Sequence, residues 1–248
     1  MSAVAVFLIA VGCADIVRRL TARQWLPVIA GPLVAAITAA LCGLWHSGDL
    51  VLVGIATVGA GGWEWSCTHA ERVGGRRLVL PLVLFVSVVV VLILLSGLGS
   101  PVAGAVKAWS GWAGVPGLGA LEPTRIVLVV GVVLLQLVTG NQLVRLLLGS
   151  VGSVKPAGQP QASDRLKGGR LLGPMERLLI LGLSLAGQLA AATAVVAAKS
   201  IIRFPEINAQ KARENGGIGI DDVTEYFLVG SFASWIVALG GLALTLPR

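Results

Sequence analysis

Charged residues are scarce in this chain of 248 residues, and their scarcity excludes a soluble globular domain. Only 12% of the residues are charged and 56% are hydrophobic, whereas a soluble domain carries about 25% charged residues. A soluble fold of this composition could not cover its surface with polar groups. The surplus apolar surface therefore predicts that the chain is solvated by a lipid bilayer.

Cysteine is also rare, and its positions argue against disulfides and metal. The three cysteines are Cys13, Cys42 and Cys67, and none belongs to a CxxC pair, so we expect neither a disulfide framework nor a zinc site. Glu64 and His69 lie close to Cys67 in the sequence but match no HExxH frame. We expect no bound metal and no cofactor.

The sequence contains no recognisable catalytic frame. Its two histidines, His46 and His69, lie at the ends of apolar runs without an obvious serine partner. Lys199 and Ser200 could form a Ser-Lys dyad in principle, but adjacent helical positions point about 100° apart. We therefore expect no catalytic residues and no enzymatic activity.

The net charge of +7 predicts a membrane surface rather than nucleic acid as the partner. No basic run alternates with aromatic residues, as single-stranded nucleic acid would require. Lys and Arg instead gather in the cytoplasmic loops of membrane proteins, where they meet anionic lipid. The N-terminus is apolar without a basic n-region, which indicates a retained first helix rather than a cleaved leader.

Apolar runs predict an all-α, polytopic transmembrane helical bundle with about seven spans. The runs lie at residues 3–17, 25–45, 50–65, 78–98, 126–148, 174–202 and 224–246. They divide the chain into a four-helix N-terminal membrane region (1–98), an interfacial segment (99–124) and a C-terminal membrane region (125–248).

Two segments are too polar or too broken to span a bilayer. Residues 99–124 contain glycines, prolines and the pair Trp109 and Trp112, and this pattern predicts a loop or short helix at the outer interface. Residues 150–174 form a Gly/Ser/Pro/Gln linker with four Lys or Arg residues, which we expect to be cytoplasmic and poorly packed.

The distribution of Lys and Arg predicts an external N-terminus. The cytoplasmic side then holds three groups of cations: the arginines that follow the first run, the arginines that precede the fourth run, and the Lys and Arg residues of the linker. The loop at 204–221 conflicts with this scheme, because seven full spans place it outside although it holds Lys211 and Arg213. A re-entrant sixth segment would bring that loop back inside.

The C-terminal half, from about Arg125, resembles a known family. The resemblance rests on an acid-Arg pair at Glu176 and Arg177, on Lys-Ser-x-x-Arg-Phe at 199–204, and on acid-Tyr-x-Leu-x-Gly at 225–230. These motifs are similar to domain-of-unknown-function family 3307, a family of bacterial membrane proteins. The resemblance implies a multi-pass protein of the bacterial inner membrane and implies no established activity.

Ionisable residues inside apolar runs are candidates for a functional site. Lys199 and Arg203 share one helical face and could hold a phosphate or carboxylate, or they could simply stabilise the end of a helix. We expect Glu225 to pair with one of these cations, with Glu176 and Gln188 nearby and the whole cluster facing the bundle interior.

Asp15 completes the set of candidates: it is either a membrane carboxylate on an ion path or the end of the first helix beside two arginines.

Three classes of function remain open. The chain could be a small transporter or channel for an ion or anionic solute. It could instead be an accessory or effector subunit in stress or defence that assembles with itself or another membrane protein. An enzyme acting on lipid phosphates is the third class, although the acidic metal motif is missing.

Overall fold

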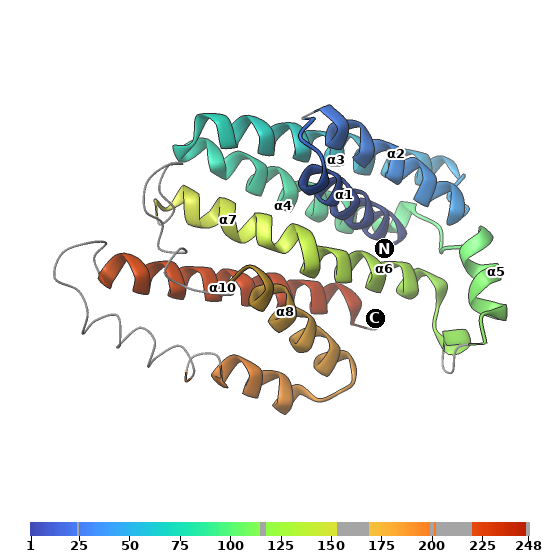
Figure 1. The fold of residues 1–248 in the computed structure, drawn as a ribbon. Coiled ribbons are helices and arrows are strands. Elements are labelled where there is room, and N and C mark those ends of the chain that lie inside the picture. Colours follow the sequence, from blue (N-terminus) through green and yellow to red (C-terminus); the bar gives the residue numbers. More distant parts are fainter. Residues whose placement is uncertain (24, 115–117, 153–168, 199–200, 202–219, 247–248) are drawn as a thin grey trace.

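Helices make up most of the described part of the chain. The computed structural model describes all residues except 24, 115–117, 153–168, 199–200, 202–219 and 247–248. Within the described residues there is no β-strand, which confirms the all-α class. Figure 1 shows the helices as a layered bundle whose long members run side by side.

Helix α1 (Ser2–Leu20) is the centre of the N-terminal region. Most of its residues are buried, because α2 (Trp25–Leu41), α3 (Ser47–Val73) and α6 (Pro123–Leu134) pack around it. Gly12 allows this approach, since a Cβ there would lie 2.8 Å from the Cβ of Leu134. Phe7 of α1 lies against Phe85 at 5.5 Å between ring centroids, and the Trp63 ring lies 5.3 Å from the same phenylalanine.

The remaining helices complete the bundle. They are η1 (Gly75–Leu78) with α4 (Val79–Leu94), η2 (Ser96–Leu98), α5 (Gly104–Trp112), η3 (Leu118–Ala120), the π-helix η4 (Leu135–Thr139), α7 (Gly140–Ser150), α8 (Gly169–Leu185), a short helix at Leu189–Ala198 and α10 (Ile220–Thr245). Helices α6, η4 and α7 follow one another without a break, so Pro123–Ser150 is one long element.

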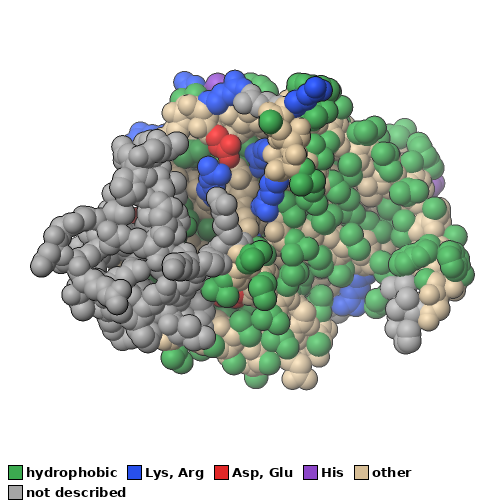
Figure 2. All heavy atoms as spheres, viewed as in Figure 1, with side chains coloured by type: hydrophobic (Ala, Val, Ile, Leu, Met, Phe, Trp, Pro, Cys, Tyr) green, Lys and Arg blue, Asp and Glu red, His purple; other side chains and the backbone are tan. Residues whose placement is uncertain are grey.

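The outer face of the bundle is apolar over most of its length. Large hydrophobic side chains stand exposed along three helices: Ile29, Leu33 and Ile37 on α2, Val83, Val86 and Val90 on α4, and Phe232, Ile236 and Leu239 on α10. Figure 2 shows hydrophobic side chains covering much of one face. In the part of the chain that the structure describes, four helical stretches are long and apolar enough to cross a membrane: Ser47–Val73, Gly75–Leu94, Pro123–Ser150 and Thr224–Thr245.

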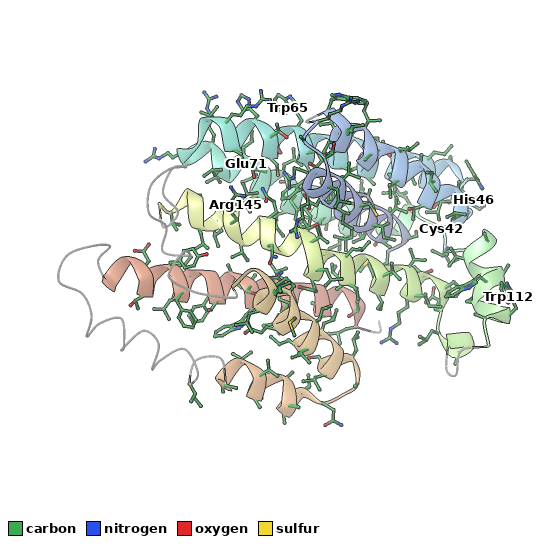
Figure 3. All side chains as sticks on the ribbon, viewed as in Figure 1. Cys42, His46, Trp65, Glu71, Trp112 and Arg145 are labelled. Carbon is green, nitrogen blue, oxygen red and sulfur yellow. The ribbon has the colours of Figure 1, made fainter. Side chains whose placement is uncertain are left out.

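The bundle has two chemically different ends. Arg18, Arg23, Arg72, Arg76 and Arg77 lie where α1 and α3 end and where α2 and η1 begin; we call this the arginine end. The opposite end is held by Asp49, whose carboxylate accepts a 2.7 Å hydrogen bond from the backbone N–H of Ser100. Figure 3 shows Glu71 and Arg145 toward the arginine end, and His46 and Trp112 at the opposite end.

The sixth expected span is not one continuous helix. The single helix predicted over 174–202 is two shorter ones, because α8 ends at Leu185 and the next helix begins at Leu189. Gly187 has φ 76°, and the N–H of Gln188 donates to the carbonyl of Leu183 at 2.8 Å. This left-handed glycine cap ends α8 inside an apolar run. Helix α8 also begins at Gly169, within the expected linker.

Helix α10 runs antiparallel to α7. Gly230 lies against the Leu148 side chain near the end of α7, and further along α10 the carbonyl of Val237 accepts a hydrogen bond from Gln136 Nε2 at 3.1 Å. The start of α10 is therefore near the end of α7, at the arginine end. Ser150, where α7 ends, and Ile220, where α10 begins, thus lie toward the same end of the bundle (Figure 1).

The segment over 99–124 contains short helices, as expected. Helix α5 has nine residues, too few to cross about 30 Å of hydrocarbon. Trp109 is 44% exposed and Trp112 is 75% exposed. The location of this segment at the outer membrane interface stays a prediction.

Candidate functional site

Two acids and one arginine meet in the interior between α1 and α3. The Arg18 guanidinium donates a hydrogen bond through Nη2 to Asp15 Oδ1, and Arg18 Nε lies 3.6 Å from Glu64 Oε2. Asp15 is 1% exposed and Glu64 is fully buried. Asp15 and Arg18 are three residues apart on α1 and so share a face, and the packing of α3 on that face brings Glu64 to them. We call Asp15, Arg18 and Glu64 the acid–arginine cluster.

The charges of the acid–arginine cluster do not balance. Two ionised carboxylates and one guanidinium carry a net charge of −1. The indole N–H of Trp63 donates to Asp15 Oδ1 at 3.3 Å, but Asp15 Oδ2 and both oxygens of Glu64 are buried without a hydrogen-bond donor. A buried uncompensated charge is costly, so the cluster favours uptake of one positive charge.

A proton is the positive charge that fits the cluster. Two ionised carboxylates cannot hydrogen-bond to each other, but a protonated Glu64 can donate to Asp15, which lies within reach. No group of three or more His, Cys, Asp or Glu side chains among the described residues could hold a metal ion.

A pocket at the arginine end lies next to the acid–arginine cluster, with Arg18 between them. It has a volume of about 240 Å³ and is lined by Arg18, Thr21, Ala22, Arg23, Pro27, Thr68, Glu71 and Arg72. Arg18 belongs to both the pocket and the cluster, and its side chain is 19% exposed. Figure 2 shows Lys and Arg side chains gathered along the upper edge of the molecule, near the end of α3. Arg18 is therefore the member of the cluster that faces the pocket, and the two carboxylates lie behind it.

A second buried arginine, Arg177, joins α8 to the rest of the bundle. Its Nε and Nη2 both donate to the carbonyl of Gln136, at 3.1 and 2.7 Å. Nη2 also donates to Asn141 Oδ1 at 2.7 Å, and Nη1 donates to Ser234 Oγ at 3.1 Å. The side chain is 1% exposed. Arg177 thus ties three helical elements together through neutral acceptors.

The π-helix η4 supplies carbonyls to two arginines, the buried Arg177 and the exposed Arg19. A π turn departs from the α-helical hydrogen-bond pattern, and such turns are frequent at functional sites. Arg177 binds the Gln136 carbonyl, and Arg19 of α1 donates to the Val138 carbonyl at 2.8 Å. Glu176 supplies a negative charge beside Arg177, and its Oε1 accepts a 3.0 Å hydrogen bond from the indole N–H of Trp235.

Of the five residues that the sequence grouped together, the structure describes Glu176, Gln188 and Glu225, and these three do not share one buried site. Glu176 is buried beside α10, whereas Gln188 is exposed at the break after α8 and Glu225 is exposed near the start of α10. Glu225 lies ten residues before Trp235, the partner of Glu176, which is about 15 Å along a helix. Lys199 and Arg203 lie outside the described residues, and so does their expected pairing with Glu225.

Sequence reasoning missed the most charged interior site. Asp15 was a candidate, but its partner Glu64 was considered only with Cys67 and His69 as a poor metal frame. Cys67 is buried. His69 lies elsewhere, with its Nε2 3.2 Å from Arg77 Nη1 and its ring stacked on Trp65 at 5.6 Å between ring centroids. The available signal was the presence of a lone acid in each of two apolar runs, because two such acids in one bundle seek a shared cation.

The described residues form an all-helical bundle with buried charged groups, and four of its helical stretches are long and apolar enough to cross a membrane. No family model matches the chain, and no curated protein and no solved structure matches it. The resemblance of the C-terminal half to domain-of-unknown-function family 3307 therefore stays a prediction.

Proposed function

We propose that this chain is a small multi-pass transporter or channel of the inner membrane and that the acid–arginine cluster is its ion site. The observation that carries the proposal is the pair of fully buried carboxylates, Asp15 and Glu64, that share one guanidinium. Buried acids without balancing charge are costly and mark ion or proton paths in membrane proteins. The pocket at the arginine end meets the cluster at Arg18, which makes that end the side from which an ion would enter.

The proposed topology has six crossings in place of the expected seven. The crossings are α1, α2, α3, η1–α4, α6–η4–α7 and α10, and α8 with the helix Leu189–Ala198 forms a re-entrant pair. The antiparallel packing of α10 on α7 supports this topology. It also places Lys211 and Arg213 on the same side as the linker cations, which satisfies the positive-inside rule.

Proton flux in proteoliposomes tests the proposal. The purified chain is reconstituted with an internal pH-sensitive dye, and a potassium diffusion potential drives proton entry. We expect flux from the wild type and its loss in Glu64→Gln and Asp15→Asn at equal amounts of folded protein. No flux of protons, Na⁺ or K⁺ above empty liposomes, either without an added anion or with a small oxyanion such as sulfate in the medium, would reject the proposal.

Asp49→Asn is the matched control. Asp49 is also a buried acid, 2% exposed, but it accepts hydrogen bonds from Ser100 and from the backbone N–H of His46 at the opposite end of the bundle. Its loss should lower thermal stability and leave proton flux per folded molecule unchanged. Equal loss of flux in Asp49→Asn and Glu64→Gln would mean that the cluster is only structural.

A membrane accessory subunit is the second candidate function. An apolar groove of about 540 Å³ runs between α3 and α4, and its lining includes Gly54, Val58 and Gly62, which are four residues apart on one face of α3. The two glycines carry no side chain and so let a second helix approach closely on either side of Val58. Native mass spectrometry tests this candidate: a monomer that transports protons excludes it, and a defined assembly without flux favours it.

A further inference from the structure

We propose that the pocket at the arginine end binds a phosphate-type oxyanion and that this binding is coupled, through Arg18, to protonation of the carboxyl pair Asp15 and Glu64. The inference rests on the proposed ion site and names the substrate class that the site would serve. It identifies the chain as a proton-linked oxyanion carrier rather than a simple proton channel.

The lining of the pocket fits an oxyanion. Three guanidinium groups, from Arg18, Arg23 and Arg72, face one carboxylate, that of Glu71, so the lining is positive on balance. The Thr21 hydroxyl is a further donor, whereas the Thr68 hydroxyl already donates to the Glu64 carbonyl at 2.9 Å. Guanidinium groups bind planar or tetrahedral oxyanions through paired N–H donors. A volume of about 240 Å³ lies below the range of sites for drug-sized ligands and suits a small anion or one headgroup.

The neighbours of Glu71 leave the pocket cationic. Gln142 of α7 donates to Glu71 Oε1 at 2.8 Å. The amide occupies this carboxylate oxygen from the α7 side, so part of the acid's hydrogen-bonding capacity is used away from the arginines. The described contacts therefore leave Arg23 and Arg72 exposed and available to an anion at the mouth of the pocket.

Arg18 is the physical link between the pocket and the cluster. Its Nη2 is bound to Asp15 and its Nε lies near Glu64, while Nη1 is buried without a hydrogen-bond acceptor. An anion in the pocket competes with both carboxylates for this guanidinium. Protonation of Glu64 removes one competitor and adds one positive charge beside the pocket, so the anion binds more tightly as the pH falls.

The charged surroundings of the carboxyl pair are compact. The groups that interact with it are Arg18 on α1 and Cys67 and Glu71 on α3. Helices α2 and α4, which pack on α1 and α3, carry no titratable side chain, and Arg19 is engaged with the Val138 carbonyl of η4. On the other elements, Arg125 lies at the far end of α6 and Arg145 is exposed on α7. Arg18 is thus the cation in direct contact with the pair among the described residues.

Sulfate is a suitable probe because its charge does not change between pH 6 and pH 8. The full chain is placed in phosphatidylcholine nanodiscs, and sulfate affinity is measured calorimetrically at both pH values. We expect wild-type affinity to be on the order of tenfold higher at pH 6, within the usual range of coupling between two sites. Glu64→Gln should bind tightly at both pH values, since its neutral side chain mimics the protonated acid.

Exposed arginines provide variants that should fold. Arg72→Gln, which changes the pocket lining, should weaken sulfate binding at least fivefold at pH 6. Arg76→Gln is the matched control, because Arg76 is an exposed arginine of the same end that does not line the pocket. Equal affinity in these two variants would overturn the assignment of the pocket.

Nanodiscs that contain phosphatidylglycerol separate a lipid headgroup from a free anion. Loss of sulfate binding there means that the anionic headgroup occupies the pocket, and retained binding means that the ligand is a free oxyanion. The coupling is overturned if wild-type sulfate affinity is equal at the two pH values, and the site is overturned if no saturable binding occurs in phosphatidylcholine. If pH-linked sulfate binding is observed but no proton flux is found, the transport function is rejected and the coupled anion site stands.

Discussion

Replacement of Arg177 by methionine should destabilise the C-terminal half of the bundle. The substitution leaves the Gln136 carbonyl, Asn141 Oδ1 and Ser234 Oγ without their donor in a buried site. Interhelical hydrogen bonds in membranes contribute about 0.6 kcal/mol each, so the four bonds of Arg177 supply about 2 kcal/mol. The negative charge of the neighbouring Glu176 also loses its cation, which brings the expected loss to about 3–5 kcal/mol.

Thermal unfolding in detergent micelles, followed by tryptophan fluorescence, measures this loss. For a chain of this length it corresponds to a fall in Tm on the order of 10 °C. Arg145→Met is the matched control, because Arg145 is an exposed arginine on α7 (Figure 3) and its removal should change Tm by less than about 2 °C. Equal Tm values for the two variants would refute the structural role of Arg177.

A double-mutant cycle locates the effect. Ser234→Ala in the wild type and in Arg177→Met should show a coupling free energy of about 1 kcal/mol, because the two side chains are hydrogen-bonded at 3.1 Å. Arg177→Lys keeps the charge but cannot reproduce the forked contacts with Gln136 and Asn141. Its Tm should fall between those of the wild type and Arg177→Met.

Three further predictions concern the cluster, the core and the topology. Glu64→Gln should be at least as stable as the wild type, and its advantage should be larger at pH 9 than at pH 6, because glutamine removes the uncompensated buried charge; equal advantages in pH-dependent melts would contradict this. Gly12→Val should lower stability by about 1–3 kcal/mol, since its added atoms meet Leu134, and an unchanged melting temperature would contradict that close approach. Single cysteines at positions 161 and 211 should react with an impermeant reagent from the same side of the membrane, because the re-entrant topology places both segments on one face. The native cysteines are buried or half-buried and should contribute little background labelling. Reaction of the two positions from opposite sides would support seven spans instead of six.

The sequence alone was sufficient to predict the most apolar helices, α4 and α10 among them. Lipid exposure requires long apolar runs, and such runs are visible in the composition of α4 and α10 without any tertiary information. The break after α8 was harder to predict, because Ala186, Gly187 and Gln188 interrupt an apolar run that is otherwise continuous. Hydropathy averages over such a short interruption, whereas the left-handed backbone at Gly187 is a local property.

The acid–arginine cluster could be predicted only in part. The i, i+3 spacing of Asp15 and Arg18 is visible in the sequence, but Glu64 meets them only through the packing of α3 on α1. The π-helix gives no clear signal either, since Leu135–Thr139 is mostly apolar and continues the pattern on both sides. Both features depend on contacts between distant segments, which a single sequence does not specify.

The π turn in η4 fixes the rotational register of α7 relative to α6. Each residue of an α-helix advances the chain by about 100° around the axis, so removal of one residue from 135–139, with return to regular α-helix, would rotate everything after it by about that angle. Asn141 would then turn away from Arg177, and Gln142 would turn away from Glu71. The two polar regions of the bundle, one at the arginine end and one beside α10, are thus kept in phase by a single extra residue.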